Sequence, residues 1–204
     1  MKKITAIILI AVMLLSTACS SGVKTNTLPL GEEAINTIVS ENKLPVTAEK
    51  LELSNDSEGL TVEYYNLKDN FTNSAIGSFS TATGTNGSAV SITNWAIIGD
   101  FFAGGEYIDC AIKTVCDVYG QFKDIDSLVN KFLDDYRNKN FIIDYNLGYW
   151  YTLHEGVYFV ATLSVENETV ILCDFTLMEK ENFKNYLEKN NSHVWAQEFY
   201  EREF

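Results

Sequence analysis

Residues 141–177 read FIIDYNLGYWYTLHEGVYFVATLSVENETVILCDFTL, and this stretch decides the fold of the chain. It holds four runs of aromatic and β-branched residues, the types that favour strands. The runs are Phe141–Tyr145, Tyr149–His154, Val157–Val165 and Thr169–Leu177, separated by two or three residues. Connections this short join antiparallel neighbours, because a parallel connection needs a much longer crossover. The sequence therefore predicts an antiparallel meander, in whose last strand the alternate residues from Ile171 to Leu177 face the core.

Upstream and downstream of this meander, the spacing of apolar residues predicts helices and further strands. Helices are predicted at Gly31–Asn42, Tyr107–Tyr119, Asp124–Asn138, Lys180–Asn190 and Val194–Arg202, with Asp124 as the N-cap of the third. Strands are predicted at Lys50–Leu53 and Leu60–Leu67, with a turn at Asn55–Gly59 between them, and a hairpin at Asn86-Gly87 between Gly77–Thr83 and Ala89–Ile98. These elements predict one α+β domain over residues 31–204, an antiparallel sheet with helices packed on one of its faces.

The first 18 residues have the organisation of a signal peptide. Lys2 and Lys3 make the start basic, and Ile4–Leu15 is almost wholly apolar. This run is shorter than the ~20 residues that cross a bilayer core. A basic start, a short apolar middle and small residues at the end are typical of a cleaved export signal. We therefore expect the mature chain to begin at Cys19 and to face outside the cytoplasm.

The end of this signal, Leu14-Leu15-Ser16-Thr17-Ala18-Cys19, resembles the lipobox of bacterial lipoproteins. The resemblance implies cleavage before Cys19, lipid on its thiol, palmitate among the acyl chains, and attachment to the cell membrane. Residues 19–30 would then form the lipidated N-terminus and a tether. Ser16 stands where that family usually has leucine. Ser16 and Ala18 also suit an ordinary signal cleavage, which would leave Cys19 unmodified.

The charge of the chain is strongly acidic. The signal holds two of the 15 basic residues and none of the 28 acidic ones, so the mature chain carries 13 basic against 28 acidic residues, a net charge of −15. A basic surface that binds nucleic acid is therefore not expected. Attachment to an anionic membrane by charge alone is not expected either, so the membrane partner would be reached through the lipid on Cys19.

Cys110, Cys116 and Cys173 remain in the body of the chain. On a helix, the six-residue separation of Cys110 and Cys116 is ~9 Å along the axis, beyond the ~7 Å reach of a disulfide between Cα atoms. Two alternatives remain for these cysteines. Either Cys110 or Cys116 forms a disulfide with Cys173, or all three are buried thiols. The sequence lacks the ligand spacing of zinc sites and the glycine-rich phosphate loops, so no metal and no cofactor are expected.

The sequence offers few candidates for catalytic residues. The one nucleophilic triad that the sequence allows is Cys116 with His154 and Asp174, and the other enzymatic possibility is a pair of carboxylates across a cleft. The motifs HExxH and GxSxG are absent. We expect no catalytic residue, and keep a cell-envelope hydrolase using Cys116 and His154 or paired carboxylates as the alternative.

The sequence offers better candidates for a binding surface, because Tyr149, Trp150 and Tyr151 form an aromatic patch on a predicted strand. Tyr149 and Tyr151 share one face and Trp150 lies on the other. One set belongs to the core, and the other could be a platform for a glycan or a peptide; ordinary sheet packing is the competing interpretation. The sequence thus favours a non-enzymatic envelope lipoprotein that binds another envelope protein or a ligand outside the cytoplasm.

Overall fold

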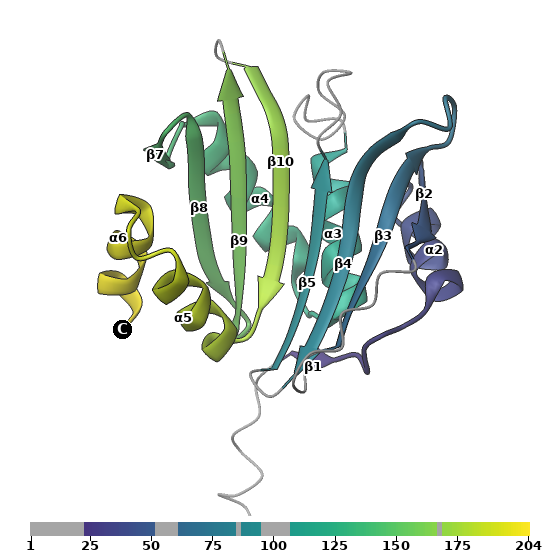
Figure 1. Cartoon of the computed structure of the whole chain (residues 1–204), viewed down its shortest axis with the longest axis horizontal. Coiled ribbons are helices and arrows are strands. Elements are labelled where there is room, and N and C mark those ends of the chain that lie inside the picture. Colours follow the sequence, from purple (N-terminus) through teal and green to yellow (C-terminus); the bar gives the residue numbers. More distant parts are fainter. Residues whose placement is uncertain (1–22, 52–60, 85–86, 95–106, 167–168) are drawn as a thin grey trace, which may run out of the picture.

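An eight-stranded antiparallel sheet forms the centre of the computed structural model (Figure 1). The structure describes residues 23–51, 61–84, 87–94, 107–166 and 169–204, except the side chains of 94 and 165–172. The strands lie in the order β2-β3-β4-β5-β10-β9-β8-β7. They are β2 Val46–Lys50, β3 Thr61–Asp69, β4 Ala75–Gly84, β5 Gly87–Asn94, β7 Ile142–Asp144, β8 Leu147–His154, β9 Val157–Glu166 and β10 Thr169–Met178.

The predicted meander is confirmed as β7 to β10, each strand paired with the next. The predicted hairpin is confirmed as well, since β4 and β5 pair along their length and close with Gly84 opposite Gly87. Gly87 has φ 97°, a left-handed conformation that favours glycine. A Cβ there would also meet the carboxylate of Glu179, so a side chain at this position would require that carboxylate to move.

One predicted strand lies elsewhere. The strand expected at Lys50–Leu53 is instead β2, which begins directly after Pro45 and ends at Lys50. The reason is burial, because Val46 and Ala48 alternate into the core while β2 pairs with β3. The turn predicted over residues 55–59 lies outside the described residues.

Three helices cover one face of the sheet: α2 Glu32–Glu41, α3 Ile108–Tyr119 and α4 Ile125–Arg137 (behind the sheet in Figure 1). Their positions confirm the predicted helices. Asp124 is the N-cap of α4, as the sequence predicted, and its Oδ1 accepts a hydrogen bond of 3.0 Å from the backbone N–H of Ser127. Aromatic rings dominate the core between these helices and the sheet, and Phe132 of α4 lies edge-on to Trp150, Phe159 and Phe175.

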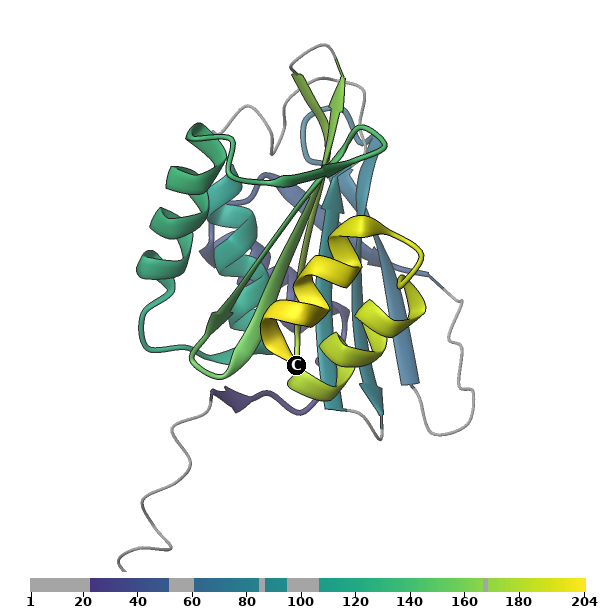
Figure 2. The same cartoon turned by 90° about the vertical axis from the view of Figure 1, so that its left-hand side faces the viewer.

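Two further helices, α5 Lys180–Lys189 and α6 Val194–Glu203, pack on the opposite face, over the meander (Figure 2). The ring of Tyr149 stacks on Trp195 at 4.2 Å, and Tyr158 stacks on Phe183 at the same distance. The α+β class and the antiparallel sheet are thus confirmed. To the predicted layer of helices on one face, the structure adds this C-terminal pair on the other, because the meander carries large apolar side chains on both faces.

The chain before α2 is held against the domain rather than extending as a tether. Lys24–Thr25 forms β1, which pairs with β6, Gly120–Gln121. Leu28 is buried, and the backbone N–H of Asn26 donates to the carbonyl of Tyr119 at 2.8 Å. The described part of the chain begins at Val23, so Cys19 and the signal segment lie outside it, and the part of the expected tether from Val23 onward packs on the domain. No helix in the described part of the chain is long and apolar enough to cross a membrane.

Candidate functional site

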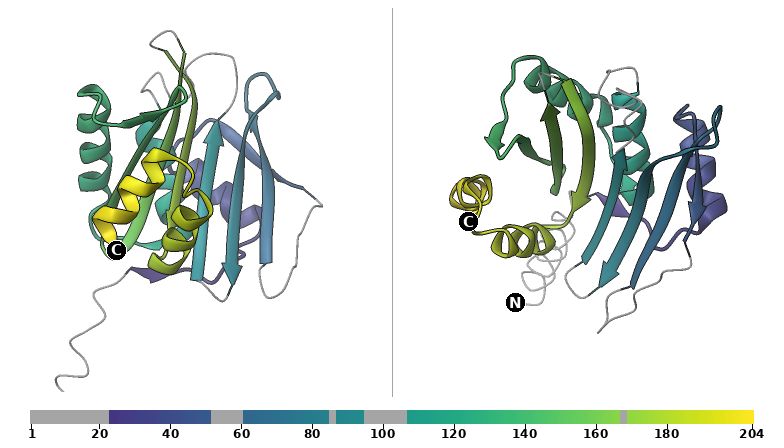
Figure 3. Two further views of the ribbon diagram at one scale, coloured as in Figure 1. Left: turned by 60° about the vertical axis from the view of Figure 1, so that its left-hand side comes forward. Right: turned by 45° about the horizontal axis from the view of Figure 1, so that its top comes forward.

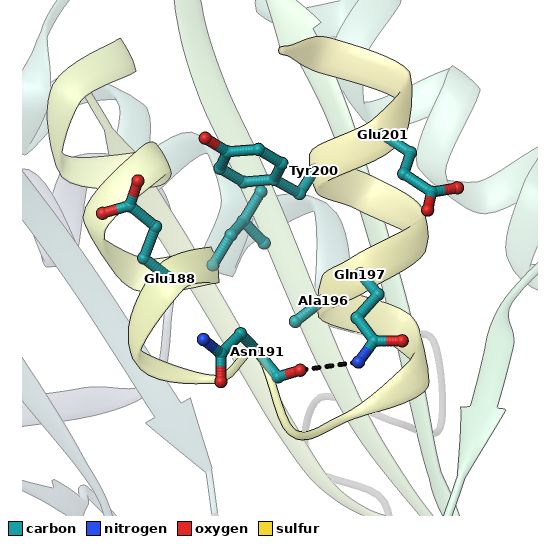
Figure 4. A pocket seen from close by; sticks show the side chains of 7 residues that line it. Glu188, Asn191, Ala196, Gln197, Tyr200 and Glu201 are labelled. Carbon is teal, nitrogen blue, oxygen red and sulfur yellow. Dashed lines mark hydrogen bonds between the residues drawn. The ribbon is translucent and has the colours of Figure 1, made fainter.

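A groove runs between α5 and α6 on the outer surface of the C-terminal helix pair (Figure 4). Its volume is about 250 Å³. The lining residues are Leu187, Glu188, Asn191, Ala196, Gln197, Tyr200 and Glu201. Leu187 and Ala196 are buried side chains and form an apolar floor, while the remaining residues carry the polar rim.

The apolar faces of the two helices fix the width of this groove. Phe183 and Leu187 of α5 and Trp195 and Phe199 of α6 are buried against the meander, so neither helix is free to rotate. Figure 3 shows the two helices side by side in front of the sheet. The turn between them is closed by a hydrogen bond of 2.8 Å from Nε2 of Gln197 to the backbone carbonyl of Asn191.

The rim of the groove is acidic. Glu188 lies on α5 and Glu201 on the outer side of α6, directed away from α5, while the ring of Tyr200 projects between the two helices (Figure 4). Nζ of Lys184 lies 3.9 Å from Oε1 of Glu188, a loose pair on exposed side chains that holds the carboxylate only weakly. Glu201 forms no ion pair with any residue that the structure describes. An apolar floor with carboxylates at its rim suits an apolar side chain with basic neighbours.

The aromatic patch predicted as a binding platform is packed against other side chains. Tyr149 and Trp150 are only 8% and 5% exposed, and Tyr151 is half-buried. Trp150 lies on the α4 side and donates from Nε1 to Oδ2 of Asp135 at 2.9 Å. Tyr149 and Tyr151 lie on the α6 side, as the alternation predicted. All three border a small cavity of about 290 Å³ between α4, β7 and α6.

The structure does not bring Cys116, His154 and Asp174 together. Cys116 of α3 is fully buried on the α3 side of the sheet, where Cys173 and Phe175 also point. Asp174 lies between these two residues on β10, so its side chain points to the opposite face. Burial raises the pKa of the Cys116 thiol well above its usual range, so at neutral pH it is a protonated thiol and a poor nucleophile.

His154 and the described cysteines are packed among other side chains of the domain. The ring of His154 stacks on Phe122 at 6.0 Å, and its Nε2 lies 3.5 Å from Oε1 of Glu155. Cys110 and Cys116 both lie on α3, and the three cysteines that the structure describes are free thiols. Burial raises the pKa of all three. Among the described residues, no group of three or more His, Cys, Asp or Glu side chains could hold a metal ion.

Asp174 belongs to a hydroxyl cluster that the sequence interpretation missed. Its Oδ1 accepts from Ser91 at 2.9 Å and from Thr93 at 3.2 Å, and its Oδ2 accepts from Thr176 at 3.3 Å. Burial raises the pKa of the Asp174 carboxyl, and these hydroxyl donors offset part of that effect. The alternation of polar residues in β5 and β10 is the sequence feature that could have indicated this cluster. Only the pairing of these two strands, however, brings its four side chains together: Ser91, Thr93, Asp174 and Thr176.

Comparison with known proteins gives no family. No protein-family model, no curated protein and no solved structure matches this chain.

Proposed function

We propose that this chain is a lipoprotein of the cell envelope that binds a partner protein outside the cytoplasm and catalyses no reaction. The observation that carries the proposal is the α5–α6 groove, an apolar cavity of about 250 Å³ with two exposed carboxylates among its lining residues. Its walls are held by buried aromatic side chains, so the site is preformed and needs little ordering on binding.

The occupant is a segment of a partner protein that places one apolar side chain on Leu187 and Ala196. Lysine or arginine residues flank that side chain and meet Glu188 and Glu201. The net charge of −13 over the whole chain supports a basic partner, because complementary charge raises the rate of encounter.

Anchorage comes from the N-terminus. The apolar run that ends in Ser16-Thr17-Ala18-Cys19 supports export and transfer of lipid to the Cys19 thiol. A binding domain held at the membrane in this way meets its partner at the cell surface. The local concentration of the domain and its partner at the cell surface, rather than a high affinity, then determines how often the groove is occupied.

The test is charge reversal at these two carboxylates. Epitope-tagged full-length chain carrying Glu188→Lys and Glu201→Lys is cross-linked in living cells and purified from detergent-solubilised envelopes beside the wild type. The matched control is Glu33→Lys with Glu41→Lys, two exposed positions on α2 at the opposite face, which changes the net charge by the same amount. Like charges now facing a basic segment should lower recovery of the cross-linked partner at least ~10-fold. Recovery should be unchanged in the control.

Two results would overturn the proposal. One is a partner that is recovered equally well with the double charge reversal, which would show that the groove is not its site. The other is turnover of a peptidoglycan, ester or peptide substrate by the purified chain, lost on His154→Ala without loss of folding.

A further inference from the structure

The N-terminal segment is fastened to one end of the domain. The backbone N–H of Val23 donates to the carbonyl of Glu155 at 3.4 Å, in the turn between β8 and β9. Lys24 and Thr25 then pair with Gln121 and Gly120. We name this end, made of β1, β6 and the β8–β9 turn, the anchor end.

We infer that the anchor end faces the bilayer and that the opposite end of the domain points away from it. The inference rests on the proposed lipid at Cys19. Only four peptide units separate Cys19 from Val23, so the fully extended chain between them spans at most ~14 Å. A folded domain of this size has a radius of gyration of ~16 Å. A tether shorter than that radius does not let the domain turn over and place its far end on the membrane.

The strand register defines the far end. β8 begins at Leu147 and ends at His154, beside Glu155 of the anchor end, so the β7–β8 turn at Tyr145 lies at the other end. Met178 pairs with Ala89 and Lys68 pairs with Ala75, which places the β3–β4 turn at that far end too (Figure 1). The eight residues of β8 rise ~3.3 Å each, so the two ends lie ~25 Å apart.

The two most exposed aromatic side chains of the described chain lie on these far turns. Phe71 in the β3–β4 turn is 85% exposed, and Tyr145 in the β7–β8 turn is 87% exposed. With the anchor end on the bilayer, both rings point outward, and the α5–α6 groove lies on a flank that the membrane does not cover. The mature chain, with 13 basic against 28 acidic residues and a net charge of −15, gives anionic lipids no means of attracting the domain, so the tether alone sets the orientation.

The test is energy transfer to labelled lipid. Full-length acylated chain is prepared with Cys110→Ser, to remove the one partly exposed native thiol, and with a single labelling site at Gln121→Cys or Ser74→Cys. Gln121 lies on the anchor end and Ser74 in the β3–β4 turn, and both are exposed. Each donor-labelled protein is reconstituted into phosphatidylcholine vesicles that carry an acceptor-labelled lipid. Transfer should be clearly more efficient from Gln121, because its label lies ~25 Å closer to the lipid plane.

Equal transfer from the two sites, or more from Ser74, in vesicle-bound protein would overturn the orientation alone. Protein that carries no lipid and does not bind the vesicles would instead overturn the proposed anchorage. A control inserts ~16 Gly and Ser residues between Ser21 and Gly22, a flexible segment with ~20 Å of r.m.s. reach. The insertion should bring the two transfer efficiencies together. A difference that survives it would show that the short tether is not the cause.

Discussion

At the scale of single residues, Asp174 is the side chain whose environment departs most from what the sequence suggests. It lies on a strand face beside three hydroxyl groups, with no basic side chain among its hydrogen-bond donors. Burial raises the folded-state pKa of its carboxyl above the unfolded value of ~4. The folded protein therefore binds this proton more tightly than the unfolded chain does. Its contribution to stability falls as the pH rises through that window and stays low above the folded pKa.

We predict that Asp174→Asn makes the protein more stable than the wild type at pH 7. The amide removes the buried charge and keeps one oxygen to accept the hydroxyl donors. The gain should be on the order of 1 kcal/mol and should vanish at about pH 3 and below, where the wild-type carboxyl is protonated in both states. Urea unfolding at the two pH values measures it. A variant that is less stable than the wild type at pH 7 would show that the hydroxyl bonds to the ionised group outweigh its burial.

The proposed anchorage depends on a single residue, Cys19. We predict that Cys19→Ala moves the protein from the membrane fraction to secreted or uncleaved forms, because the thiol that receives the lipid is gone. Radiolabelled palmitate should enter the wild type and not the variant. Absence of label from the wild type, with normal cleavage of the signal, would leave Cys19 as an ordinary mature N-terminus.

At the scale of elements, the N-terminal segment caps the C-terminus of α3, a helix about ninety residues away in the sequence. Nδ2 of Asn26 donates to the carbonyl oxygens of Asp117 at 2.8 Å and Val118 at 3.0 Å, and its backbone N–H donates to that of Tyr119. The last four carbonyls of any helix lack partners within the helix. Asn26 supplies partners for three of them in α3 and fastens the anchor end at the same time.

We predict that Asn26→Ala lowers the free energy of unfolding by ~1 to 2 kcal/mol, through two lost hydrogen bonds at partly buried carbonyls. Asn130→Ala, at an exposed position on α4, is the matched control and should change it by less than ~0.5 kcal/mol. Urea unfolding of both variants tests this. Equal stability of Asn26→Ala and the control would mean that solvent replaces the cap without cost.

At the scale of the whole molecule, the sheet joins two halves of the same connectivity. Each half is a helix followed by four antiparallel strands, α2 with β2 to β5 and α4 with β7 to β10. The last strands of the two halves, β5 and β10, pair with each other along six residue positions. α3 packs against both of these strands, so one core crosses the boundary.

Because the core is continuous, we predict that the two halves unfold together. Urea transitions followed by far-ultraviolet circular dichroism and by fluorescence of the tryptophans should coincide, as in a two-state unfolding. The measurement uses a Trp95→Phe variant, because Trp95 directly follows β5 of the first half in the sequence. Of the two remaining tryptophans, Trp150 lies on β8 of the second half and Trp195 on α6, which packs against that half, whereas the dichroism reports on the whole sheet. A dichroism change that precedes the fluorescence change would show that the first half unfolds alone.

The sequence by itself determined the local structure. The period-two alternation of residues 141–177 with its short turns predicted the meander, and the three-and-four spacing predicted every described helix to within a few residues. Asp124 was predicted as an N-cap, and the parity of Tyr149, Trp150 and Tyr151 placed them on the correct faces. These features depend on neighbours a few residues away, so periodicity and turn chemistry were sufficient to find them.

Only the tertiary structure decided what covers each face. Alternation shows that Tyr149 is turned away from Trp150, but not that Trp195 of α6 stacks on it. The polar segment after Cys19 has the composition of a tether, and its attachment depends on α3 carbonyls about ninety residues away. Asp174 and Cys116 are separated because the sheet lies between them, and the groove exists only where two helices lie side by side. Each of these depends on long-range packing, which the residue types in one segment do not encode.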